Sequence, residues 1–139
     1  MILSPHLSEK EYRCRHCGKL PSAFNGGELP QCYEWFFEDF EDIRLEYGLP
    51  IIIDSGYRCL EHNKLVGGED LSIHLFGLAL DCSTQNKDDI DVLYNVVLAV
   101  HPELRIGFYK TKRFIHIDRG YDIYPQVLKE WRKGARWTK

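Results

Sequence analysis

Apolar residues recur at helical spacing in two stretches of the chain. Across residues 33–47 (YEWFFEDFEDIRLEY) they follow steps of three and four, as on one face of a helix, and Gly48 and Pro50 end the pattern. Across 87–100 (KDDIDVLYNVVLAV) the spacing is again helical, with acidic residues in the first turn and Pro102 just beyond the end. Two helices are therefore predicted.

Shorter runs rich in β-branched and aromatic residues predict strands. Residues 51–54 form one such run, and 104–109 and 113–118 read as the two arms of a hairpin. Residues 124–133 have the composition of a terminal helix that packs Trp131 on the core. Strands and helices thus alternate irregularly after the first helix.

The stretch 77–83 is predicted to be a strand with two different faces. Because successive side chains of a strand point to opposite sides, Ala79, Asp81 and Ser83 share one face, and the apolar side chains between them share the other. A polar site is expected on the first face and the core on the second.

Length and pattern together indicate a single α+β domain over residues 1–139. With 139 residues and 44% hydrophobic composition, the chain can bury one sizeable core. Residues 1–32 mix Pro, Gly, Ser and Cys without a sustained period, so an irregular N-terminal segment is expected there. The remaining elements favour an antiparallel sheet with helices packed on one side.

Charge and hydropathy restrict the possible partners. A net charge of -3 and a pI near 6.1 provide no field that would attract nucleic acid. No run approaches the roughly 20 apolar residues of a membrane-spanning helix. The opening MILSPHLSEKEY lacks the basic and apolar blocks of a secretory signal. We therefore expect a monomer that is cytoplasmic as synthesised, with neither nucleic acid nor membrane as a partner.

The cysteines leave several alternatives open. There are five of them, so at least one cannot pair within the molecule. Cys14 and Cys17 form a C-x-x-C pair, and with Cys32 and Cys59 they could form disulfides, bind a structural metal or stay reduced. Because the spacing does not repeat a two-knuckle zinc ribbon, disulfides or free thiols are favoured over a second metal.

Three residues have the chemistry of a catalytic zinc site. Such a site uses three protein ligands drawn from His, Asp, Glu and Cys, and keeps a fourth position for water. His74 precedes the predicted strand 77–83, which contains Asp81, and His116 lies in a second predicted strand. On that second strand, Asp118 shares the face of His116. Two strands could therefore converge on one metal.

The motifs around these residues resemble a known peptidase family. S-G-Y-R at 55–58, H-N at 62–63, S-x-H-x-x-G-x-A-x-D at 72–81 and F-x-H-x-D at 114–118 occur in this order. The set resembles the M15 family of zinc D-Ala-D-Ala carboxypeptidases and peptidoglycan L,D- or D,D-endopeptidases, which share the hedgehog/DD-peptidase fold. The resemblance covers roughly residues 34–120, and the opening LSPHLSEKEY is similar to phage-encoded members.

The resemblance implies roles for individual residues. His74, Asp81 and His116 match the family's zinc ligands, and Arg58 matches an arginine that receives a substrate carboxylate. The planar guanidinium suits that task because it binds a carboxylate through two parallel hydrogen bonds. Ser72 is grouped with Arg58 among the substrate-binding residues. It lies two residues before His74 and would fix the loop that presents the His74 imidazole.

One position departs from the family pattern. In several branches the general base is an acidic residue three positions before the last histidine ligand, and here that residue is Arg113. Asp118 is the best substitute in the sequence, although it could instead orient a ligand imidazole. Tyr109 is a candidate donor to the developing oxyanion. His62 is the leading alternative metal ligand.

The resemblance implies zinc-dependent hydrolysis of amide bonds in peptidoglycan stem peptides. Such a protein would act on the cell wall after its release, or as a phage product. The alternative is a non-catalytic, zinc-containing domain on the same scaffold that binds peptidoglycan or a protein. Arg113 favours this alternative, whereas the intact ligand set and Arg58 oppose it.

Overall fold

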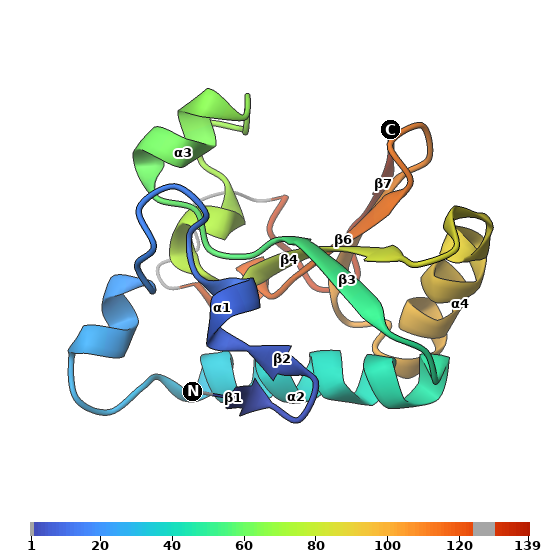
Figure 1. The fold of residues 1–139 in the computed structure, drawn as a ribbon, viewed down its shortest axis with the longest axis horizontal. Coiled ribbons are helices and arrows are strands. Elements are labelled where there is room, and N and C mark those ends of the chain that lie inside the picture. The colour runs from blue at the N-terminus through green and yellow to red at the C-terminus, as the bar shows by residue number, and fades with distance from the viewer. Residues whose placement is uncertain (1, 124–129) are drawn as a thin grey trace.

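The fold is built on a five-stranded sheet with the order β3-β4-β6-β5-β7 (Figure 1). The computed structural model describes residues 2–123 and 130–139. Adjacent strands from β3 to β5 are antiparallel, and β7 joins the edge of β5 in parallel. The strand bounds are β3 Ile51–Ser55, β4 Ala79–Thr84, β5 Arg105–Tyr109, β6 Phe114–Asp118 and β7 Arg136–Thr138.

Two long helices pack on one face of this sheet. Helix α4 (Ile90–Val100) lies against β4 and β6, and α2 (Gln31–Tyr47) packs on α4. The ring of Tyr94 lies 4.6 Å from that of Phe108, which joins α4 to β5. Both predicted helices are thus present, although a short 3-10 turn, Lys87–Asp89, precedes α4. The core between helices and sheet contains Phe36, Phe40, Ile43, Leu80, Leu93, Val97, Ile106, Ile115 and Ile117.

The opposite face of the central strands carries polar side chains. In the β4–β6 ladder Asp81 lies opposite His116 and Ala79 opposite Asp118, while Gly107 of β5 lies opposite His116 on its other side. The alternation predicted for residues 77–83 therefore holds in β4, whose residues are all buried. This face forms the floor of the candidate site.

The N-terminal segment, expected to be irregular, contains several short elements. Strands β1 (Ile2–Ser4) and β2 (Leu7–Ser8) form a hairpin against α2, as Figure 1 shows at the bottom of the view. Helix α1 (Glu9–Tyr12) follows with a Ser8–Glu11 capping box, and the 3-10 helix η1 spans Ser22–Asn25. These elements are too short to produce a detectable period.

Tyr12 fixes this segment to the rest of the domain. Its ring is fully buried, its hydroxyl donates to the carbonyl of Gly77 at 2.6 Å, and its own carbonyl accepts from the N–H of Tyr57 at 2.8 Å. Gly77 has φ +79°, and a Cβ there would lie 2.4 Å from both Pro21 and the Tyr12 hydroxyl. A glycine is therefore required where the N-terminal segment crosses the site loop.

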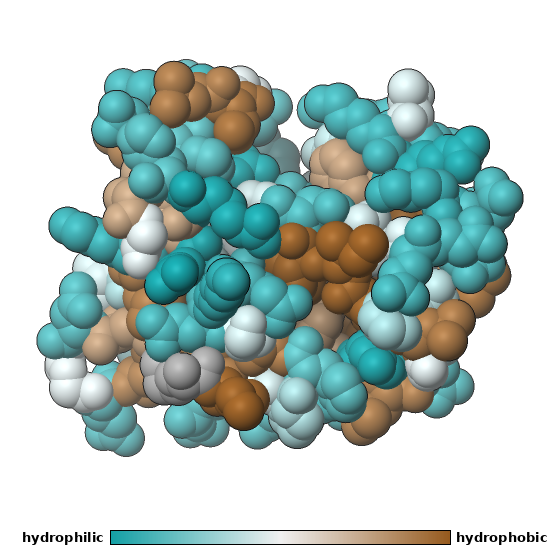
Figure 2. All heavy atoms as spheres, in the orientation of Figure 1, coloured by the Kyte–Doolittle hydropathy of each residue, from teal (hydrophilic) through white to brown (hydrophobic). Residues whose placement is uncertain are grey.

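Three short helices complete the loops around the polar face. Helix α3 (Leu60–Leu65) follows β3, the 3-10 helix η2 (Ile73–Phe76) precedes β4, and η4 (Gly120–Asp122) follows β6. In Figure 2 the surface is hollowed at the top of the view, between the lobe that carries α3 and the lobe that carries β7. Both lobes contribute residues to the candidate site.

The C-terminal region differs from its prediction. The helix expected over 124–133 falls mostly on residues 124–129, which lie outside the described part of the chain, and residues 130–133 are turn and irregular structure. Trp131 is buried in the core, as expected. Strand β7 was not predicted, because a three-residue edge strand leaves no alternation pattern.

The prediction of an α+β domain is confirmed, and the sheet is mixed only because β7 runs parallel to β5. Among the described helices, none is long and apolar enough to cross a bilayer.

Candidate metal centre

Three side chains from two strands and a helical turn meet on the polar face. One nitrogen each of His74 and His116 and one oxygen of Asp81 lie within 4.8 Å of one another. The Asp81 Oδ1 atom is central, at 3.2 Å from His74 Nε2 and 2.9 Å from His116 Nδ1. All three residues are buried, with 2%, 6% and 9% exposure for His74, Asp81 and His116. The structure thus brings together the predicted ligands.

The orientation of His74 leaves its second nitrogen directed at this cluster. Nδ1 lies 2.7 Å from the carbonyl oxygen of Gly56, which can only accept, so Nδ1 carries the proton. Nε2 then presents a lone pair. It is buried and has no hydrogen-bond partner among the described residues. Because a lone pair of Nε2 faces the Asp81 carboxylate, a cation between the two atoms would satisfy both.

His116 is held by the same arrangement with its nitrogens exchanged. Nε2 lies 2.6 Å from Asp118 Oδ2, so this nitrogen donates to the carboxylate and Nδ1 is the nitrogen that faces Asp81. A carboxylate that accepts from the distant nitrogen of a ligand imidazole is a common feature of zinc sites, since it fixes the ring and its tautomer.

The spacing of the donor atoms fits a small divalent cation. Ligands about 2.0–2.1 Å from a tetrahedral zinc ion lie roughly 3.3 Å apart. The two distances of 3.2 and 2.9 Å from Asp81 Oδ1 are close to this value. Two imidazoles and one carboxylate also leave the fourth position of a tetrahedral ion for water or substrate.

The protonation of the three residues reflects their mutual contacts. Burial alone would raise the pKa of Asp81, but the neighbouring His74 and His116 outweigh it and lower that pKa far below its usual range. Burial lowers the pKa of His74, and the Asp81 charge offsets this only in part. Burial also opposes the charging of His116, yet its bonds to Asp118 and Asp81 raise its pKa to about 9. Asp81 is therefore ionised and His74 neutral, and a cation bound here would displace the Nδ1 proton of His116.

Arg58 lies next to the centre. Its Nη2 is 3.1 Å from Asp81 Oδ2, the oxygen that faces away from the imidazoles. Its Nε donates to Ser55 Oγ and its Nη1 to Asn63 Oδ1, both at 3.0 Å. Three contacts thus fix the guanidinium plane beside the metal position, and each Nη retains one further N–H.

Asp118 lies beneath the centre and is fully buried. Its Oδ2 accepts from His116, and its Oδ1 accepts from Arg105 Nε at 2.9 Å and from the N–H of Gly120 at 2.8 Å. A carboxylate with both oxygens occupied and no contact with solvent is placed to orient His116. The geometry therefore favours the orienting alternative for Asp118 over the general-base alternative.

Trp137 forms one wall of the site, although it is not among the site residues predicted from the sequence. Its ring lies 5.3 Å from that of His116 and 5.0 Å from the Arg105 guanidinium. It covers Gly107, where a Cβ would come within 2.4 Å of the indole. Its Nε1 donates to the hydroxyl oxygen of Tyr109 at 3.0 Å, so the Tyr109 proton is not used by this bond.

Comparison with protein-family models identifies the family. The Peptidase M15 model matches residues 6–118, which is most of the chain. The chain belongs to the M15 peptidase family. No curated protein matches the chain at a significant level. Membership indicates a metallopeptidase, in agreement with the chemistry of the centre.

Two other predicted residues have clear positions in this M15 domain. The Oγ of Ser72 accepts from the N–H of His74 at 3.2 Å and caps η2, so it fixes the turn that presents the imidazole. His62 lies on α3 beside His16, with ring centroids 6.0 Å apart, and not in the group formed by His74, Asp81 and His116.

The position that carries an acid in several M15 branches is part of a turn here. Arg113 has φ +57°, and its guanidinium is 3.3 Å from the exposed Asp88 carboxylate. It therefore contributes to the outer end of the β5–β6 hairpin.

Proposed function

We propose that this M15 domain hydrolyses amide bonds in peptidoglycan stem peptides with one zinc ion held by His74, Asp81 and His116. The observation that carries the proposal is the buried Nε2 of His74, which faces Asp81 without a hydrogen-bond partner among the described residues. Family membership supplies the reaction class. The finer assignment to D-amino-acid-containing peptides rests on the resemblance of the motifs, and the domain would act as a monomer on the cell wall after release or as a phage product.

When bound, zinc would lower the pKa of a coordinated water and polarise the scissile carbonyl. The chain's own residues supply the frame for this chemistry. The Gly56 carbonyl and the Asp118 carboxylate hold the two imidazoles in the tautomers that direct lone pairs at the cation.

Arg58 and Tyr109 are the proposed substrate contacts. The free N–H groups of Arg58 beside Asp81 would bind a carboxylate of the stem peptide through charge-assisted hydrogen bonds. Tyr109, whose hydroxyl accepts from Trp137, would donate its proton to the oxygen that becomes negative during the reaction. Arg58 contacts Asp81 directly, and Tyr109 is connected to the site through Trp137, whose ring lies beside His116.

A second candidate function follows from the two positions at which a general base was expected. Arg113 replaces the family's usual acid, and both oxygens of the buried Asp118 already accept hydrogen bonds. A non-catalytic domain that binds stem peptides through zinc and Arg58 would not need a general base at either position. This alternative and the peptidase proposal differ in one measurable property, the appearance of cleaved product.

The test uses purified protein, synthetic stem peptides and mass analysis of products, with and without a chelator. We expect cleavage that is lost on chelation, restored by zinc and abolished in His116→Ala. His6→Ala, which alters an exposed imidazole bound to Glu41, is the matched control and should cleave normally. Release of the terminal residue would indicate a carboxypeptidase, and an internal cut an endopeptidase. Zinc-dependent binding of the peptides without any product would overturn the peptidase proposal in favour of the binding domain.

A further inference from the structure

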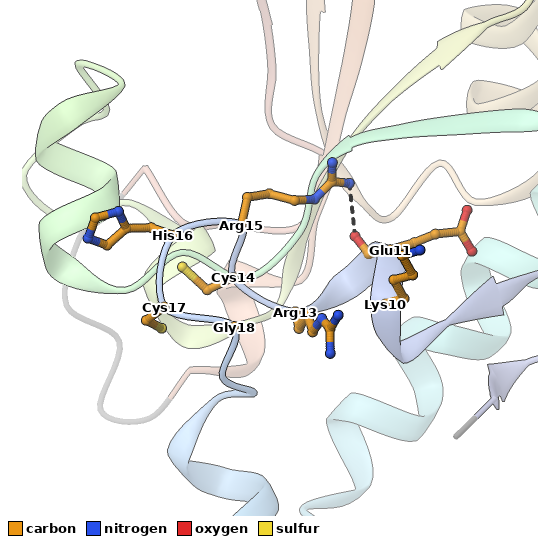
Figure 3. A pocket seen from close by; sticks show the side chains of 8 residues that line it. All are labelled: Lys10, Glu11, Arg13, Cys14, Arg15, His16, Cys17 and Gly18. Atoms are coloured by element: carbon orange, nitrogen blue, oxygen red, sulfur yellow. Dashed lines mark hydrogen bonds between the residues drawn. The ribbon is translucent and has the colours of Figure 1, made fainter.

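A second group of metal-ligating side chains lies outside the centre described above. The Sγ atoms of Cys14, Cys17 and Cys59 lie within 4.8 Å of one another, although Cys59 is far from the other two in sequence. Cys14 and Cys17 line a surface pocket formed by residues 10–18, and Figure 3 shows this loop beside α3, with His16 directed toward that helix. All five cysteines are free thiols in the structure.

The loop from Cys14 to Gly18 has the geometry of a tight ligand turn. Gly18 adopts φ +72°, and its N–H donates to the carbonyl of Cys14 at 2.9 Å, which closes the C-x-x-C segment on itself. A residue with a Cβ would be strained at this φ. The turn therefore keeps both thiols on the side of the loop that approaches α3.

Backbone N–H groups are directed at two of the sulfur atoms. The N–H of Cys59 lies 3.4 Å from Cys14 Sγ, and the N–H of His62 lies 3.4 Å from Cys59 Sγ. Such contacts favour the thiolate, which is the form that binds metal.

We propose that Cys14, Cys17 and Cys59 bind a structural zinc ion, with His62 as the fourth ligand. Three thiolates and one imidazole suit a soft, tetrahedral cation, and a site closed by four protein ligands has no position for a reactive water. Cys59 and His62 form a C-x-x-H pair at the start of α3, so the two halves of the site are C-x-x-C and C-x-x-H.

His62 is preferred to His16 for two reasons. His62 is partly buried, whereas His16 is exposed and its Nε2 lies 3.3 Å from Glu61. The two rings stack at 6.0 Å with an angle of 18° between their planes, so His16 lies against one face of the His62 ring. Cys32 lies in α2 and, like both imidazoles, is not in the group of three thiols, so His62 would have to turn toward the thiols to complete the site.

The proposed ion would join the N-terminal segment to the loop that carries Arg58. Cys59 follows Arg58 directly, and Arg58 contacts Asp81 in the first centre. Besides the thiols, the hydrogen bond from Tyr57 to Tyr12 and the contact of His16 with Glu61 join these two segments. A metal bond between them would hold α1 and the start of α3 in place.

The test counts metal and identifies its ligands in the full-length protein. After zinc loading and removal of excess metal, we expect two zinc ions per chain in the wild type and one in His116→Ala. Cobalt-loaded His116→Ala should show the intense thiolate-to-cobalt charge-transfer absorption, which a site made of His and Asp alone cannot produce. This signal does not depend on peptide cleavage, so it tests the thiolate site whether or not the peptidase proposal is correct.

Variants locate the ligands. Cys17→Ser in the His116→Ala background should lose the remaining zinc and the charge-transfer band, whereas Cys32→Ser should keep both. His62→Ala should weaken zinc binding at least tenfold, and His16→Ala should not; the reverse result would overturn the assignment of His62. One zinc ion in the wild type, combined with cobalt-loaded protein that lacks thiolate absorption, would overturn the site itself, even where a cysteine variant fails to fold.

Discussion

Two of the groups of metal-type ligands in this domain are built in opposite ways. His74, Asp81 and His116 are buried, and the ring nitrogen of each imidazole that faces away from Asp81 bonds Gly56 or Asp118. Cys14, Cys17 and Cys59 come from loops and a helix start, and Cys17 is exposed. The first group is positioned by the sheet before any metal binds, whereas the second consists of segments that a metal would tie together.

This difference separates a catalytic site from a structural one. A reactive centre must keep its ligands rigid and leave one position free, so paired strands and hydrogen-bonded carboxylates do the positioning. A structural centre uses every position for protein ligands and contributes directly to folding. The comparison predicts that substitutions around His74, Asp81 and His116 lower both catalysis and global stability. Metal binding by Cys14, Cys17 and Cys59 should not change in these variants.

The largest effect is expected for Asp118→Asn. It removes the carboxylate that His116 and Arg105 share, and breaking a buried pair of this kind costs about 3–5 kcal/mol. Zinc affinity at the first centre should fall about 10–100-fold because the imidazole is no longer oriented. Chemical denaturation and zinc titration measure the two quantities, and the cobalt–thiolate absorption of the loop group should be unchanged.

Asp88→Asn is the matched control for that substitution. It also removes an aspartate paired with an arginine, but both partners are on the surface, so stability should change by no more than about 0.5 kcal/mol. If Asp118→Asn instead abolished cleavage while zinc affinity stayed unchanged, Asp118 would transfer a proton and the orienting role would be wrong.

A smaller effect is expected for Gly107→Ala, which alters the wall of the buried centre without touching a ligand. The new Cβ would lie 2.4 Å from the Trp137 indole and displace it from His116 and Tyr109. Overpacking of this kind costs about 1–3 kcal/mol. Gly26→Ala, at a position where a Cβ meets no atom within 4 Å, should be neutral.

Denaturation and tryptophan fluorescence would report the displacement of Trp137, and cleavage assays its consequence. Wild-type stability and activity in Gly107→Ala would show that β7 can move without loss of stability and that Trp137 does not shape the site.

The smallest effect is expected at a third group of residues of metal-binding types, Asp39, His101 and Glu103. We interpret this group as an ion-pair network, so it serves as a comparison for the two metal sites. His101 bonds Asp42 at 2.9 Å and Glu103 at 2.6 Å, where α4 ends against α2. Burial lowers the pKa of His101, but these carboxylates outweigh it and raise that pKa above its usual value. The charged form is therefore stabilised in the folded state.

Because the folded-state pKa of His101 is raised, its contribution is complete below the unfolded pKa of about 6.5 and is lost as pH rises through the folded pKa. His101→Gln should cost about 1 kcal/mol near pH 6 and less at pH 9, measured by urea denaturation at both values. In that background Asp42→Asn should add little, since their pairing is already removed. A cost independent of pH, or zinc bound at this group, would contradict the ion-pair interpretation.

Local sequence patterns predicted much of the framework. The helices over 33–47 and 87–100 and the strands that carry Asp81 and His116 were evident because apolar periodicity reflects which face of an element is buried. Residues 1–32 and β7 were not, because elements of two to four residues are stabilised by distant partners such as Gly77 and β5.

The sequence by itself determined the two long helices and the central strands, the family and the set of residues able to bind a cation. Only the tertiary structure decided which imidazole nitrogen faces Asp81, that Asp118 lies beneath His116 with both oxygens occupied, and that Cys59, not Cys32, joins the C-x-x-C pair. The physical reason is that periodicity records burial along one element. Side-chain direction and long-range contact arise from how several elements pack together, and no single segment of the chain encodes them.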